Sequence, residues 1–253
     1  MKIVAFVAPK GGGKDTCADL LREMNISAGK LSFAGPMKNI LVKTTGLAVQ
    51  LMHDPVHKET ELKEPIVLTS RLLRRIRKEC ELFLDPTRPD GTLMYRTGVA
   101  SIAGIENQVM KTPRQLMQFI GKEFIRDRIY QDWHIEAAFQ KKVMDALKPN
   151  GVYCVTDVRF LNEYEFLKKR FGDDFVCFYV EREEAEERLK TATHESELEI
   201  LKIKAKLSED SILKNDGSLD DLKTKLKSLD LKPKKAAPGS RLKYVDKKGN
   251  PVT

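Results

Sequence analysis

Apolar runs and turn signals alternate along the chain in the pattern of an α/β protein. Continuous apolar runs of strand length predict strands buried on both faces at 3–7, 152–156 and 175–180. Shorter runs predict two more strands at 30–33 and 211–214. Apolar residues at helical spacing follow these runs at 16–24, 37–45, 162–171, 183–189 and 218–229. The alternation predicts a three-layer α/β/α domain with a mostly parallel sheet and right-handed crossovers.

The middle of the chain has a weaker pattern. We expect residues 50–110 to form a helical insertion or substrate-side region, with a helix at 72–84, a turn at 86–91 and a strand at 93–97. Thr112 and Pro113 are an N-cap followed by proline at the first helical position, so a helix begins there and its apolar face continues to Phe124. A further helix is expected over 132–147, ended by the Pro-Asn-Gly turn at 149–151.

The formal net charge of +8 lies mostly at the end of the 253-residue chain. Residues 232–253 carry seven lysines or arginines against Asp246, which leaves only +2 for residues 1–231. We therefore expect one domain at 1–231 and a basic, poorly ordered tail at 232–253. Because the domain itself has so little excess charge, specific nucleic-acid binding is not expected.

The composition and the start of the sequence also exclude some classes of protein. No apolar run approaches the roughly 18–20 residues of a membrane span, and the first residues form a strand and not a secretory signal, so a cytoplasmic protein is expected. The four cysteines, at positions 17, 80, 154 and 177, form no C-x-x-C pair, which argues against disulfide and zinc roles.

A glycine-rich loop after the first strand is the strongest chemical signal. Ala8-Pro9-Lys10-Gly11-Gly12-Gly13-Lys14-Asp15-Thr16 joins a buried strand to a helix, where main-chain N–H groups and the helix N-terminus can bind phosphate. Ala8 replaces the first glycine of the usual P-loop pattern, and Asp15 takes the usual hydroxyl position, with Thr16 one place later. The loop predicts a site for a nucleoside triphosphate, with Lys14 reaching its β- and γ-phosphates.

A second, phosphorylated substrate would need further cations. Candidates lie at the ends of predicted elements: Lys10, Lys38, Arg71, Arg114, Arg126, Arg159 and Arg182. Arg159 and Asp157 follow a buried strand, at the sheet edge where ligands of open α/β proteins bind. There Asp157 could hold a magnesium water or a sugar hydroxyl.

Six segments in order resemble the deoxynucleoside monophosphate kinases of tailed bacteriophages. They are 11–16, Phe33-Ala34-Gly35-Pro36-Met37-Lys38, 112–121, Thr156-Asp157-Val158-Arg159-Phe160 with Asn162-Glu163, Thr193-His194, and 215–219. The resemblance runs from Met1 to about Leu229 and is weak over 45–110. It implies transfer of the γ-phosphoryl of ATP to a dNMP with Mg²⁺, supplying DNA precursors in the cytoplasm of an infected bacterium, and it allows a homodimer.

The resemblance also implies roles for individual residues. It places Gly11, Gly12, Gly13, Lys14, Asp15, Thr16, Asn215 and Gly217 around ATP. It places Lys10, Met37, Lys38, Arg71, Arg114, Trp133, Asp157, Arg159 and Glu163 around the dNMP. Lys14, Arg159 and Arg182 are the expected catalytic cations, and Thr16 and Asp157 the expected magnesium contacts through water. Trp133 has a second interpretation, as a half-buried helix anchor.

Two other functions stay open at this point. A P-loop kinase of another small acceptor, such as a nucleoside or a phosphorylated metabolite, would use the same loop. A non-catalytic, ATP-dependent nucleic-acid-binding protein would use the basic tail, although the chain lacks interleaved aromatic and basic residues.

Overall fold

A computed structural model describes residues 1–54, 56–84, 102–191, 195–233, 244–245 and 251–252. The chain forms two compact units, the first from Met1–Ser32 and Ala146–Thr253 and the second from Phe33–Asp145. The turn expected at 86–91, the strand expected at 93–97, the Thr193-His194 segment and most of the tail lie outside the described residues. The described tail residues include one antiparallel pair, β8 (Tyr244–Val245) and β9 (Pro251–Val252).

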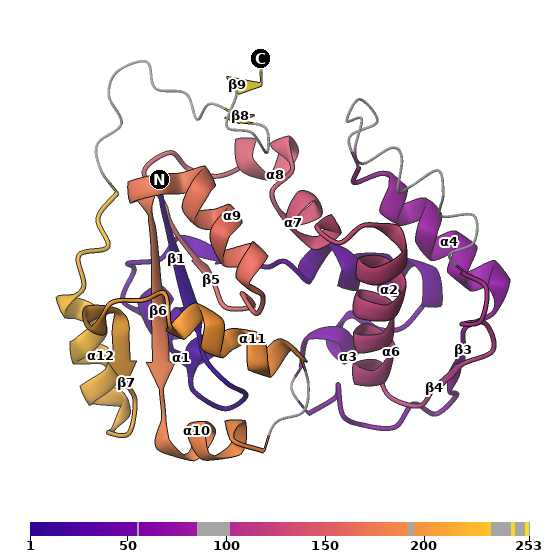
Figure 1. Ribbon diagram of the computed structural model, residues 1–253, viewed down its shortest axis with the longest axis horizontal. Coiled ribbons are helices and arrows are strands. Elements are labelled where there is room, and N and C mark those ends of the chain that lie inside the picture. The colour runs from indigo at the N-terminus through magenta and orange to yellow at the C-terminus, as the bar shows by residue number, and fades with distance from the viewer. Residues whose placement is uncertain (55, 85–101, 192–194, 234–243, 246–250, 253) are drawn as a thin grey trace. The chain divides into compact units, whose positions relative to one another are not determined.

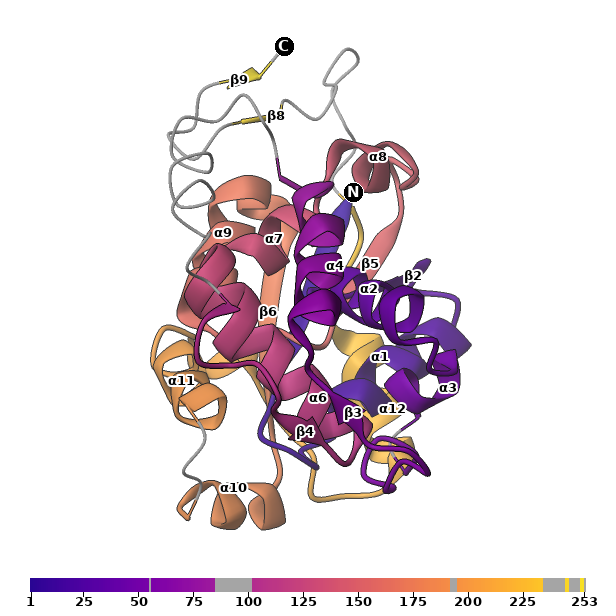
Figure 2. The same cartoon turned by 90° about the vertical axis from the view of Figure 1, so that its right-hand side faces the viewer.

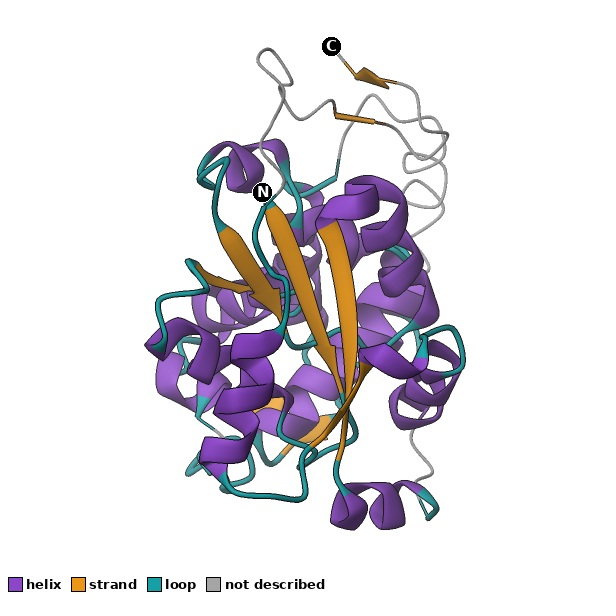
Figure 3. Cartoon of the chain, turned by 90° about the vertical axis from the view of Figure 1, so that its left-hand side faces the viewer, coloured by secondary structure: helices purple, strands orange, loops and turns teal. Residues whose placement is uncertain are grey.

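The first unit is built on a five-stranded sheet whose strands are all parallel. Its order is β2-β5-β1-β6-β7 (Figures 1 and 3). The strands are β1 (Lys2–Val7), β2 (Gly29–Leu31), β5 (Val152–Val155), β6 (Phe175–Glu181) and β7 (Ile212–Lys214). β1 is central and wholly buried, which explains its continuous apolar sequence.

Helices cover both faces of this sheet. Alternate residues of β1, among them Val4 and Phe6, share a core with α1 (Lys14–Glu23) and α12 (Leu219–Ser228). On the other face, α9 (Leu161–Phe171) packs on β6, and α11 (Glu195–Lys204) packs on α9 (Figure 1). Short elements complete the unit: α10 (Glu183–Leu189), η3 (Gly172–Asp174) and η4 (Glu209–Ser211). This is the three-layer α/β/α arrangement that the sequence predicts.

The second unit is mainly helical. Its helices are α2 (Gly35–Thr45), α3 (Val49–His53), α4 (Ser70–Glu81), α6 (Pro113–Phe119), the π-helix η2 (Ile120–Ile129), α7 (Trp133–Ala138) and α8 (Lys141–Asp145). α2 packs against α4, α6 and α7, around a core that includes Leu41, Leu73 and Phe124 (Figure 2). A two-stranded antiparallel pair, β3 (Ile66–Val67) and β4 (Val109–Met110), completes it.

Most elements agree with the sequence pattern, and the exceptions are local. The Thr112 cap is confirmed as a reciprocal capping box with Gln115, but the helix widens to π geometry after Phe119. The single helix expected at 132–147 is wrong. The chain leaves helical geometry at Phe139, whose buried ring packs on Phe33 with centroids 5.4 Å apart, so two short helices form.

Among the described residues, none of the helices has the length and apolar character needed to cross a bilayer.

Candidate functional site

The glycine-rich loop has a backbone that only glycine adopts easily. Gly11 and Gly13 have φ values of 84° and 97°, in the left-handed region. Gly13 is the N-cap of α1, and the N–H of Cys17 donates to its carbonyl at 3.0 Å to start the helix. A Cβ on Gly12 would lie 2.7 Å from the Ala8 Cβ, so glycine at position 12 makes room for alanine at position 8.

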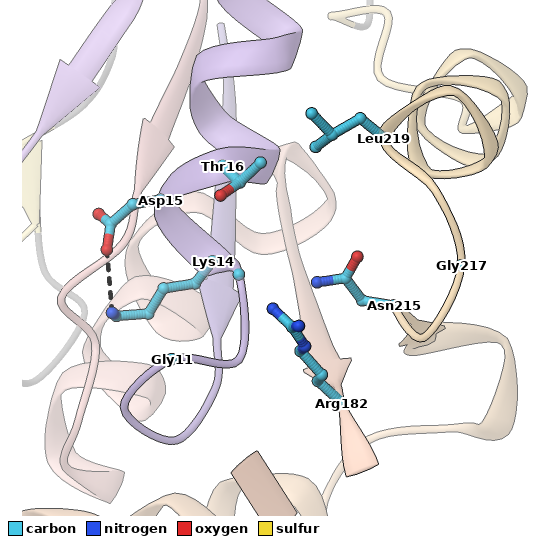
Figure 4. A pocket seen from close by; sticks show the side chains of 9 residues that line it. Gly11, Lys14, Asp15, Thr16, Arg182, Asn215, Gly217 and Leu219 are labelled. Carbon is cyan, nitrogen blue, oxygen red and sulfur yellow. Dashed lines mark hydrogen bonds and ion pairs between the residues drawn. The ribbon is translucent and has the colours of Figure 1, made fainter. Parts of the chain in front are cut away.

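A pocket of about 410 Å³ opens on this loop. In Figure 4 the loop and the start of α1 form one wall, and the segment after β7 forms the opposite wall. The lining residues are Gly11, Gly13, Lys14, Asp15, Thr16, Arg182, Asn215, Gly217 and Leu219. Seven of the eight residues expected around ATP therefore line one pocket, and the eighth, Gly12, lies between two of them.

Lys14 is held at the pocket by its neighbour. Its Nζ lies 3.0 Å from Oδ2 of Asp15, and its side chain is 18% exposed (Figure 4). The other carboxylate oxygen of Asp15 accepts a hydrogen bond of 2.7 Å from the Thr156 hydroxyl at the end of β5. Burial by itself would raise the pKa of Asp15, but the Lys14 charge and these hydrogen bonds hold that pKa below its usual value. Asp15 thus stays ionised and orients the lysine.

The opposite wall is tied directly to the loop. The Asn215 side-chain amide donates to the Gly12 carbonyl at 3.1 Å, and the Asn215 N–H donates to Glu181 at the end of β6. Ser218 caps α12 in a reciprocal capping box with Asp221. Leu219, the first residue of that helix, is 62% exposed and gives the pocket an apolar wall.

Two arginines lie near the loop: Arg182, which is one of the candidates from the sequence, and Arg188, which is not. Arg182 follows β6, lines the pocket and pairs with Glu184 at 3.3 Å. Arg188 on α10 lies against the loop, because its Nη2 is 2.6 Å from the position of a Cβ on Gly11. Arg188 stands in a glutamate-rich segment, which gives no local signal of a site.

The residues expected at the end of β5 lie within the first unit. Asp157 accepts a 2.6 Å hydrogen bond from the Ser32 hydroxyl, at the carboxyl ends of β5 and β2. The buried Glu163 carboxylate accepts from the N–H groups of Arg159 and Phe160, at 2.8 and 3.0 Å, and so closes the start of α9. Lys10 is exposed on the loop, one residue before Gly11.

The other residues expected around the dNMP lie in the second unit. Arg114, in the first turn of α6, pairs with Glu59 at 2.9 Å, and its N–H donates to the Lys58 carbonyl. Arg71 is exposed on α4, Met37 is buried on α2, and Lys38 beside it is half-buried.

Three basic groups of the second unit influence one another. Burial lowers the pKa of His53, and the positive charges of Lys38 and Lys58 lower it further. The sequence analysis missed His53 and Lys58 because they fall where the family resemblance is weak.

Trp133 is a core residue in this structure. It is fully buried, its Nε1 donates to the Cys80 carbonyl at 2.9 Å, and its ring packs edge-on against Phe83 and His134. The structure thus favours the second interpretation of Trp133, and we leave it out of the proposed nucleotide site.

All four cysteines are buried free thiols. Burial raises the pKa of the Cys17 thiol to about 12. The described residues contain no group of three His, Cys, Asp or Glu side chains that could hold a metal ion. Among these residues, the expected magnesium contacts Thr16 and Asp157 therefore stand in no such group.

A parallel α/β sheet with a glycine loop, a lysine and a helix N-terminus at the end of its central strand defines the class of phosphate-binding P-loop-type folds. The sequence model of one family, described as deoxynucleotide monophosphate kinase, matches residues 70–226. The chain belongs to this family and is a kinase that phosphorylates deoxynucleoside monophosphates. No curated protein matches the chain. The matched range begins after the glycine loop, so the loop and the family match are separate indications.

Proposed function

We propose that this kinase transfers the γ-phosphoryl group of ATP to the 5′-phosphate of a dNMP, giving ADP and a dNDP. The observation that carries the ATP side is the glycine loop, whose left-handed glycines and Lys14 line a pocket of about 410 Å³. The family supports the dNMP side.

On the donor side, the main-chain N–H groups of Gly11 and of residues 13–16 would bind the β- and γ-phosphates, while the Gly12 N–H donates to the Pro9 carbonyl within the loop. Lys14 would leave its contact with Asp15 in part and neutralise charge on the transferred group. Arg182 lines the same pocket and would act on the same charge. Asn215, Gly217 and the exposed Leu219 would flank the adenine, with Leu219 against its face.

On the acceptor side, the candidates in the first unit are Lys10, Asp157 and Arg159. Those in the second unit are Met37, Lys38, Arg71 and Arg114, joined by His53 and Lys58. A dianionic phosphate would relieve the mutual repulsion of Lys38, Lys58 and protonated His53. The acceptor phosphate is already a nucleophile, so the residues need only align it and neutralise charge.

Magnesium fits this site as an ion held mainly by substrate. Because the described part of the chain holds no cluster of three metal-ligating side chains, phosphate oxygens and water would supply most of its coordination, as is common for Mg²⁺. Thr16, and Asp157 through water, would provide the protein contacts. When bound, the ion neutralises charge on the β- and γ-phosphates.

The setting follows from the resemblance to the phage kinases. We propose that the enzyme supplies dNTP precursors for phage DNA synthesis in the cytoplasm of an infected bacterium, as a monomer or a homodimer.

The test is an ADP-release assay with ATP and each of the four dNMPs and the matching NMPs. We expect turnover with at least one dNMP, and we expect Lys14→Ala to abolish it. Lys223→Ala is the matched control, because Lys223 is an exposed lysine of the same unit on α12, away from the pocket lining. It should retain full turnover.

The outcomes separate the alternatives. Turnover with nucleosides or phosphorylated metabolites but no nucleotide would favour a kinase of another acceptor. A lack of turnover with every acceptor, together with DNA binding that disappears on deletion of 232–253, would favour the nucleic-acid-binding alternative.

A further inference from the structure

A carboxylate from a distant helix contacts the glycine loop. Oε2 of Glu197, on α11, accepts a hydrogen bond of 3.2 Å from the main-chain N–H of Lys10. Lys10 directly precedes Gly11, the first loop residue that lines the pocket. An anion that belongs to the protein thus occupies a main-chain donor next to the part of the loop that lines the pocket.

Helix α11 holds this carboxylate in place. Ile200 and Ile203 are buried beneath the helix, and Lys204 bonds to Glu181 at 2.7 Å and to Glu186 at 3.1 Å. Glu197, Ile200 and Lys204 are spaced i, i+3 and i+7, so they share the face that packs on the protein. The helix backbone that carries Glu197 is therefore fixed by packing and by ion pairs.

Two features show that this edge of the loop is suited to an anion. The N-terminus of α1 directly follows the left-handed Gly13, so the first main-chain N–H groups of that helix end at the loop. The Arg188 guanidinium lies against Gly11, so positive charge is present beside the Glu197 contact. A polyphosphate in the pocket would place further negative charge close to that carboxylate.

We propose that Glu197 is an internal competitor of the nucleotide phosphates and sets the affinity of the loop for them. When a polyphosphate binds, the Glu197 carboxylate must leave the Lys10 N–H or remain beside a like charge. Either event weakens binding. The cost acts on phosphates and not on the nucleoside, so Glu197 lowers affinity for ATP without affecting affinity for adenosine. This inference rests on the proposed binding of ATP by the loop.

The test is the variant Glu197→Gln, which keeps an oxygen that can accept from Lys10 but removes the charge. Isothermal titration should show a Kd for ATP about three- to tenfold lower than that of the unaltered protein, at low salt. The matched control is Glu187→Gln, which removes one exposed carboxylate of α10 that pairs with Lys190. Its Kd for ATP should change by less than about twofold.

Titration with adenosine and an NMR measurement complete the test. Adenosine should bind the unaltered protein and Glu197→Gln equally, and the Lys10 amide proton should move upfield in nucleotide-free Glu197→Gln, as a charge-assisted bond is lost. A Kd of Glu197→Gln for ATP that is unchanged or higher would overturn the inference. An equal gain in affinity for adenosine, or an unchanged Lys10 amide proton shift, would also overturn it. If neither the unaltered protein nor Glu197→Gln bound ATP, both the proposed function and this inference would fail. If both bound ATP with the same Kd, only the inference would fail.

Discussion

Substitution of Gly13 by alanine tests the link between loop geometry and nucleotide binding. Gly13 has φ 97°, and a left-handed L-residue costs about 1–2 kcal/mol. A Cβ there would also collide with the Asn215 side-chain amide, which now donates to Gly12 at 3.1 Å. Loss of that hydrogen bond costs about 0.5–1.5 kcal/mol. Gly13→Ala should therefore lower the free energy of unfolding by about 2–3 kcal/mol.

Gly46 supplies the matched control. It follows α2 with φ 76° and ψ 5°, in the same left-handed region as Gly13, and a Cβ there would meet nothing within 4 Å. Gly46→Ala should therefore show only the backbone cost, about 1–2 kcal/mol. Urea unfolding followed by circular dichroism measures both. In titrations with ATP, Gly13→Ala should raise the Kd at least about tenfold, which is about 1.4 kcal/mol, while Gly46→Ala leaves it unchanged.

The reasoning would be refuted by equal stability losses in the two variants combined with normal ATP affinity of Gly13→Ala. That result would mean that the left-handed turn and the Asn215 contact are incidental to phosphate binding. A stability loss with normal affinity would separate the two roles and refute only the link to the nucleotide.

Three further predictions concern Trp133, His53 and Cys17. Trp133→Phe should destabilise the protein by about 1–3 kcal/mol, because the Cys80 carbonyl loses the indole donor while keeping its bond from the Phe83 N–H, and the smaller ring leaves a gap at a fully buried position. It should leave the KM for dNMP unchanged, and a selective rise in KM would restore Trp133 to the substrate site. Because the pKa of His53 lies below its ordinary value near 6.5, its protonation opposes folding, so stability should fall as the pH drops through that pKa. NMR should show the midpoint of the His53 titration rising when a dNMP binds near Lys38 and Lys58. A His53 midpoint at or above 6.5 in the free protein would contradict this. With its pKa raised to about 12, the buried Cys17 thiol should resist iodoacetamide at pH 8 until urea unfolds the protein, and rapid labelling of the native protein would disprove its burial.

The sheet could be predicted because its strands carry unambiguous local information. β1, β5 and β6 are buried on both faces, so their sequences are continuously apolar and bounded by turns. The glycine loop could also be recognised, since left-handed backbone restricts the residue type at Gly11 and Gly13. The Thr112 and Ser218 caps were readable for a similar reason, because they rely on bonds to residues three positions away.

The features that were missed depend on distant contacts. α11 exposes Leu198 and Leu201 as well as burying Ile200 and Ile203, so its apolar spacing is blurred. β3 and β4 have two residues each, too few to show alternation. Arg188 and Glu197 gain significance only because the fold brings them to the glycine loop, and nothing in their own segments indicates this.

The strand order has a consequence for how the protein is made. β1 is translated before both of its neighbours in the sheet, and its register partners there include Val152 on one side and Phe175 on the other. The whole second unit is translated between β1 and these partners, so β1 stays unpaired while that unit is made. Such long-range pairing is slow, and until it occurs an apolar strand with unpaired main-chain groups is exposed to other chains. Nascent chains stalled before residue 152 should therefore bind chaperones, and release should coincide with the emergence of β5 and β6.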